Sequence, residues 1–157
     1  MTDNPAVGAS VEGCCVAGTW RNGLWMVWTG KVTVDGLRTV DAVGRRLAKI
    51  HPRYFTVSIS LQGIPMPDAD ARNFAAKLVK QREPSVLVST TVLEGDGFWM
   101  STSRMITSAI FKMTSQRLNK VCATLGDASV ILAPHVEPHA TADDVLLALR
   151  AMREAKG

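Results

Sequence analysis

The stretch WRNGLWMVWT, residues 20–29, decides the fold class of this 157-residue chain. Asn22 and Gly23 both tolerate positive φ, as a type I′ turn requires, and apolar runs flank them. The sequence therefore predicts a β-hairpin whose first strand lies within residues 10–19. In the second strand, residues 24–29, apolar side chains would point to both sides, which is typical of a strand covered on both faces.

Helical and strand patterns alternate after this hairpin. The expected elements are a helix from residue 34 to the proline at 52, a strand over 54–61, a helix from Asp68 to Pro84, a strand over 85–93, a Met-rich helix over 98–113, a short strand over 120–124, a brief helix from 126 to Pro134 and a last helix over 141–155. Thr33, Asp68 and Thr141 suit helix N-caps. The order β-β-α-β-α-β-α-β-α-α predicts an α/β fold, with helices on a mixed, mostly parallel sheet that begins with a β-hairpin.

The segment YFTVSISL, residues 54–61, alternates apolar and polar side chains, which predicts a half-buried strand. With 46% hydrophobic and 20% charged residues, the chain has the composition of one globular domain. We expect a flexible tail over residues 1–9, an α/β domain over 10–134, and a helical extension of that domain over 135–157.

The three cysteines, Cys14, Cys15 and Cys122, are an odd number with two of them adjacent, which is a poor disulfide framework. We therefore expect free thiols and a cytoplasmic location. Cys14 and Cys15 would point to opposite faces of a strand, so at most one would be buried. The sequence contains no run of about 18 apolar residues, so we expect no membrane span. The net charge of +4 falls on expected helix surfaces, so no nucleic-acid partner is expected.

Several motifs could carry chemistry, but each has a simpler explanation. Residues 95–97 (Gly-Asp-Gly) before the hydroxyl-rich 101–103 could hold a phosphate, yet an ordinary tight turn explains them as well. His135, Glu137 and His139 could ligate a metal, but the proline between the last two argues for a plain loop. No base accompanies any cysteine. We therefore predict no catalytic residues, no metal and no cofactor.

The loop over residues 62–70 and the helix that it opens form the first candidate binding site. Ile64, Met66, Asp68, Asp70 and Arg72 would present a partner-binding surface. The alternative is structural: Asp68 only caps the helix, and Asp70 only complements the positive end of the helix dipole.

The second candidate site lies in the Met-rich helix. Trp99, Met100, Met105 and Met113 could line a ligand pocket or an interface, because Met adapts to irregular apolar shapes. More often such a stripe belongs to the core.

Element order and loop sequence together resemble the STAS domain family, the anti-sigma-factor-antagonist-like domains, over roughly residues 10–134. The segments LWMVWTGKVTV (24–34), IPMPDADAR (64–72) and LAPH (132–135) are similar to STAS-like proteins of myxobacteria. The resemblance implies a regulatory domain that binds a protein partner.

In signalling STAS domains, a serine or threonine after the third strand is phosphorylated and controls binding of a kinase-like partner. The matching stretch here, residues 67–71, contains no hydroxyl residue, so the resemblance implies no phosphorylation switch at this place. Asp70 would instead hold a permanent negative charge.

Three hypotheses follow from the sequence. The first is a non-enzymatic protein-interaction module of cytoplasmic signalling or assembly, which also self-associates into a homo-oligomer. The second is a carrier or sensor of a small apolar ligand. The third is an enzyme of unrecognised type, which would bring residues such as Asp68 and His135 together.

Overall fold

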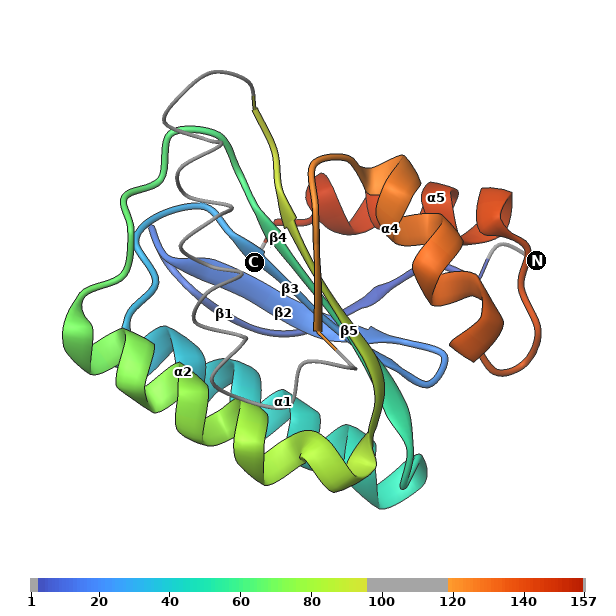
Figure 1. Cartoon of the computed structure of the whole chain (residues 1–157), viewed down its shortest axis with the longest axis horizontal. Coiled ribbons are helices and arrows are strands. Elements are labelled where there is room, and N and C mark those ends of the chain that lie inside the picture. Colours follow the sequence, from blue (N-terminus) through green and yellow to red (C-terminus); the bar gives the residue numbers. More distant parts are fainter. Residues whose placement is uncertain (1–2, 96–118, 157) are drawn as a thin grey trace.

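The computed structural model describes residues 3–95 and 119–156, and its strands form one six-stranded mixed sheet (Figure 1). The strands are β1 (Ala6–Val11), β2 (Cys15–Trp20), β3 (Gly23–Trp28), β4 (Tyr54–Ser60), β5 (Val86–Leu93) and β6 (Asn119–Cys122). They lie in the sheet in chain order. The first two pairings are antiparallel and the last three are parallel, which confirms the predicted α/β class with a mixed, mostly parallel sheet.

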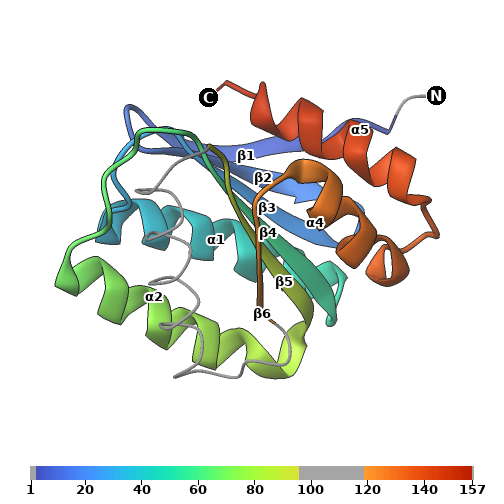
Figure 2. The ribbon, with the colours of Figure 1, turned by 45° about the horizontal axis from the view of Figure 1, so that its top comes forward.

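Helices cover both faces of this sheet. They are α1 (Val34–Ile50), α2 (Ala69–Arg82), α4 (Leu125–Leu132) and α5 (Ala142–Arg153), with the short 3₁₀ helices η1 (Glu83–Ser85) and η2 (Ala133–His135). Figures 1 and 2 show α1 and α2 side by side on one face, and α4 and α5 on the other. This three-layer arrangement buries both sides of the central strands.

Strand β3 shows how the two layers are filled. Trp25 and Val27 belong to the apolar core under α4 and α5. Leu24, Met26 and Trp28 belong to the core under α1 and α2. All six residues of β3 are buried, which confirms the prediction of a strand covered on both faces.

The three predicted N-caps are confirmed. The hydroxyl oxygen of Thr33 accepts a hydrogen bond from the backbone N–H of Gly36 at 3.0 Å, which caps α1. Asp68 caps α2 in the same way. Thr141 and Asp144 form a reciprocal capping box at the start of α5.

The prediction of a flexible tail over residues 1–9 is wrong for residues 6–9, which belong to β1. The turn that separates β1 from β2 has Gly13 at φ +70°, so the apolar run expected as one strand over residues 10–19 is divided between two. β1 joins the sheet through antiparallel backbone pairing with β2, which does not require large apolar side chains.

The hairpin between β2 and β3 is confirmed, but its predicted turn is not. Trp20 pairs with Gly23, so Arg21 and Asn22 are the two turn residues. Only Arg21 has a positive φ, of 51°, as in a type II′ rather than a type I′ turn. Gly23 is required for a different reason: a Cβ there would lie 2.1 Å from Cζ of Phe55.

Asn22 is fully buried and connects the hairpin to the chain before α5. Its Nδ2 donates to the carbonyl oxygen of His135 at 2.9 Å, and its Oδ1 accepts from the backbone N–H of Glu137 at 2.8 Å. The residue expected to supply turn flexibility is therefore a tertiary cross-link.

The segment over residues 135–157, expected as a helical extension, is part of the main core in its described residues. Val145, Leu149 and Met152 of α5 are buried in the core under α4 and α5. Within the described residues, no helix is both long enough and apolar enough to cross a lipid bilayer.

The expectation that at most one of Cys14 and Cys15 would be buried is wrong. Both are buried and both belong to the core under α1 and α2, because Cys14 lies in the turn before β2 rather than within a strand. All three cysteines of the chain are free thiols, as predicted. Burial is the main reason that the pKa of Cys15 rises to about 12, so this thiol is chemically inert at neutral pH.

Candidate functional site

The first candidate site is the loop of residues 61–67, which leaves the end of β4 and leads into α2. None of its residues forms a helix or strand. Gln62, Gly63 and Pro65 are exposed, whereas Ile64 and Met66 are half-buried. Gly63 has φ +89°, a conformation that glycine adopts without strain. The loop therefore presents Pro65 and parts of Ile64 and Met66 at the surface.

Two carboxylates follow this loop at the start of α2. Asp68 Oδ1 accepts a hydrogen bond from the backbone N–H of Ala71 at 2.9 Å, and Asp68 Oδ2 lies 3.5 Å from Nζ of Lys31. The hydrogen bond from Ala71 is the main cause that lowers the pKa of Asp68, and the charges of Lys31 and Arg72 act in the same direction. Asp68 is thus ionised at neutral pH, and Asp70 lies exposed beside it. Asp68 therefore caps α2, and its side chain is also exposed to solvent.

Arg72 fastens the loop to α2. Its Nη1 donates to the carbonyl oxygen of Pro67 at 2.7 Å. Within the described part of the chain, no carboxylate lies within ion-pair distance of this guanidinium group. One N–H group of Arg72 therefore binds the backbone of the loop. Its other N–H groups remain available to the space between the loop, α2 and the sheet.

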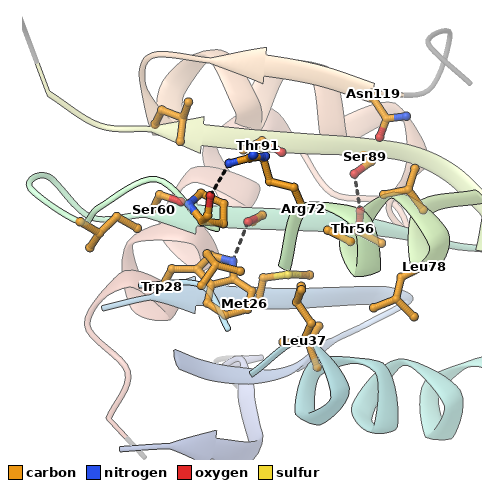
Figure 3. A pocket seen from close by; sticks show the side chains of 18 of the residues that line it. Met26, Trp28, Leu37, Thr56, Ser60, Arg72, Leu78, Ser89, Thr91 and Asn119 are labelled. Carbon is orange, nitrogen blue, oxygen red and sulfur yellow. Dashed lines mark hydrogen bonds between the residues drawn. The ribbon is translucent and has the colours of Figure 1, made fainter. Parts of the chain in front are cut away.

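That space is a cavity of about 230 Å³ on the α1 and α2 side of the sheet (Figure 3). Its described walls come from β3, β4, β5 and β6, from the loop, and from α1, α2 and η1. Ile64, Met66 and Arg72, three of the five residues predicted for the partner-binding site, line it. Asp68 and Asp70 do not, so the structure divides the predicted site into an inner apolar part and an outer acidic part.

The cavity floor is rich in hydroxyl groups. The described hydroxyl residues that line it are Thr56, Ser58 and Ser60 of β4 and Ser89 and Thr91 of β5. On the opposite face of the same strands, Phe55, Val57, Ile59, Val88 and Val92 fill the core under α4 and α5.

The prediction that β4 is only half-buried is therefore wrong, since both of its faces are covered. Thr56 and Ser60 are each only 7% exposed. The period-2 pattern identifies a polar face correctly, but it does not show whether that face meets water or a cavity. The unused signal was the second hydroxyl-bearing strand, β5, which pairs with β4.

Hydrogen bonds within the floor leave two hydroxyl groups without partners. Thr56 Oγ1 donates to Ser89 Oγ at 2.6 Å, and Trp28 Nε1 donates to Ser58 Oγ at 3.0 Å. Ser60 Oγ and Thr91 Oγ1 have no hydrogen bond in the described structure, although these residues are only 7% and 8% exposed. Both hydroxyls line the cavity.

Charges at the far end of the cavity neutralise each other. Arg82 Nη2 lies 2.9 Å from Asp41 Oδ1, and Arg45 Nε lies 2.8 Å from Asp41 Oδ2. Glu83 also lines this end. Arg72 and Glu83 are eleven residues apart on α2 and η1, which places them about 16 Å apart along the helix. Of the two described arginines that line the cavity, Arg82 is thus ion-paired, and Arg72 has no ion-pair partner among the described residues.

The other sequence candidates do not assemble into a site in the described residues. Asp68 lies on the α1 and α2 side of the sheet, and His135 lies in η2 beyond α4 on the other side. Among residues 3–95 and 119–156, no group of three His, Cys, Asp or Glu side chains could hold a metal ion. The second candidate site, formed by Trp99, Met100, Met105 and Met113, lies outside the described residues, as do most of the glycine-rich turn and the hydroxyl run that follows it.

No family model, no curated protein and no solved structure significantly matches this chain. The resemblance to STAS domains is therefore a proposal, and the function has to be argued from the geometry above.

Proposed function

We propose that the protein is a non-enzymatic, STAS-like interaction module of cytoplasmic signalling or assembly, and that it binds a protein partner through the loop of residues 61–67 and the first turn of α2. The observation that carries this proposal is the surface made by that loop. Ile64 and Met66 are half-buried beside exposed Pro65, and the carboxylates of Asp68 and Asp70 adjoin them. Apolar groups bordered by charge are typical of the centre and rim of a protein interface.

The chemistry of this surface defines the complementary partner. Asp68 is held ionised by its helix-capping hydrogen bond, and Asp70 adds a second exposed carboxylate. The partner should therefore offer an apolar depression bordered by lysine or arginine side chains. Such charge pairs across a rim mainly raise the association rate and weaken as salt is added.

Two further parts of the proposal concern location and self-association. The three free thiols are those of a protein kept in a reducing compartment, which supports the cytoplasm. Self-association would use a second copy of this chain as one partner. Sedimentation equilibrium across a hundredfold range of concentration tests it, and a constant monomer mass would contradict it.

Site-specific photocross-linking tests the interaction surface. A photoreactive amino acid in place of exposed Gln62 should form an adduct with one defined protein in native cells. The same group in place of Leu147, which is 65% exposed on α5, should not. Adducts of the same pattern from both positions, or none from position 62, would contradict the proposal.

A charge-reversal pair then tests the acidic rim. Asp70 and Asp143 each occupy the second position of a helix, α2 and α5 respectively, on opposite faces of the sheet. Asp70→Lys should lower the association rate with the cross-linked partner about tenfold at low salt, whereas Asp143→Lys should leave the rate unchanged. Equal effects of the two substitutions would place the interface elsewhere.

A further inference from the structure

We infer that the cavity behind the loop binds a small amphipathic monocarboxylate, with its head group held by Arg72, Ser60 and Thr91 and its apolar body directed towards α1. This inference concerns the inner side of the loop and the sheet, whereas the protein interface proposed above lies on the outer side; Ile64 and Met66, half-buried, belong to both.

The head-group site contains two hydroxyl groups that open on the cavity and have no hydrogen-bond partner in the described structure. Ser60 and Thr91 are more than nine-tenths buried, line the cavity, and have no hydrogen-bond partner in the described structure. A buried hydroxyl without a partner is unfavourable, so such groups usually meet water or a ligand. Two neighbouring strands, β4 and β5, thus offer two hydroxyl donors to the same space.

Arg72 supplies a positive charge at this polar end of the cavity. Figure 3 shows its side chain extending from α2 towards the strands that carry Ser60 and Thr91. Only one of its five N–H donors is used within the described residues, by the carbonyl of Pro67. Asp68 already has Lys31 as its ion-pair partner. A guanidinium group with two hydroxyl groups favours an acceptor with negative charge, and a carboxylate supplies two such oxygens.

The remaining walls select an apolar body. Met26 and Trp28 of β3, Leu37 of α1 and Leu78 of α2 supply apolar lining, and Trp28 is the register neighbour of Ser60 in β3. The indole N–H of Trp28 is already satisfied by Ser58, so its ring presents an apolar surface. An apolar cavity of about 150 Å³ accepts a benzene molecule. The 230 Å³ found here therefore suits a single ring or a chain of about eight carbons.

Calorimetric titration of the full chain with sodium octanoate and with 1-octanol separates the two parts of this inference. The wild type should bind octanoate at least tenfold more tightly than octanol. Arg72→Gln should remove that preference, and Arg72→Lys should keep part of it. Arg150→Gln is the matched control, since Arg150 is exposed on α5 across the sheet, and it should leave the preference unchanged.

Loss of the contact between Arg72 and Pro67 could loosen the loop, so a second variant examines the head-group site without touching Arg72. Ser60→Ala combined with Thr91→Val should reduce octanoate affinity about tenfold and leave octanol affinity within twofold. Equal affinity for the acid and the alcohol in the wild type would overturn the head-group assignment. Binding of neither compound would overturn the whole inference.

Discussion

Removal of the Asn22 side chain should test how the hairpin is joined to the C-terminal layer. Asn22→Ala deletes both the donor to His135 and the acceptor for Glu137, which are held at 2.9 and 2.8 Å. The side chain is fully buried. The change therefore removes one side-chain link between this hairpin and the chain that leads into α5, and leaves the hydrogen bonds from Arg21 Nη1 to the carbonyl oxygens of Pro138 and His139.

The size of the effect follows from the two backbone groups left unpaired. Each buried group without a partner costs about 1–3 kcal/mol. Glu137 is exposed and His135 is half-buried, so water reaches this segment and the lower part of that range applies. We expect the free energy of unfolding to fall by about 2–3 kcal/mol. With a urea m-value of about 2 kcal/mol per molar, the unfolding midpoint should fall by about 1–1.5 M.

Urea unfolding followed by circular dichroism measures this change, and Asn73→Ala is its control. Asn73 lies exposed on α2, where alanine is the better helix former, so the control should be neutral or slightly stabilising. Hydrogen exchange should also show faster exchange of the Glu137 amide in Asn22→Ala. A loss of less than 0.5 kcal/mol (about one third of a single unsatisfied group), or equal midpoints for the two variants, would refute the cross-link.

Three other predictions concern packing, thiol chemistry and pH. Gly23→Ala should destabilise the protein by about 1–3 kcal/mol in thermal unfolding, because the new methyl group would overlap the buried ring of Phe55; Gly126→Ala, whose nearest contact would be 3.8 Å away, should be neutral or stabilising. At pH 8, Cys15 should react with a thiol reagent at least ~100-fold more slowly in the native than in the unfolded protein, because burial raises its pKa to about 12, and native-state labelling at the unfolded rate would contradict this. The pKa of Asp144 is lowered mainly by the backbone N–H of the N-cap residue of α5, so its contribution is present above its unfolded pKa and lost as the pH falls through its folded pKa. The difference in Tm between the wild type and Asp144→Ala should therefore shrink below about pH 4, and a difference that stays constant with pH would rule out the charged capping box.

Part of the candidate site could be predicted from the sequence, because it depends on local chemistry. Asp68 is a good helix cap wherever the helix lies, and prolines 65 and 67 prevent the loop from becoming helical. The cavity could not be predicted. Ser60 and Thr91 are 31 residues apart in the chain, and only the parallel pairing of β4 with β5 brings them to one floor.

The sequence by itself determined the type and order of the elements and the places where helices begin, since periodicity and capping act over a few neighbouring residues. Only the tertiary structure decided what each face meets. The polar side of β4 lines a cavity because α1, α2 and the loop of residues 61–67 cover it. Asn22 became a buried cross-link rather than a flexible turn residue because the chain before α5 packs against the hairpin. The continuous apolar run of β3 did indicate cover on both faces, but the elements that cover a polar face are distant in the chain, so the alternating pattern of β4 could not specify its burial.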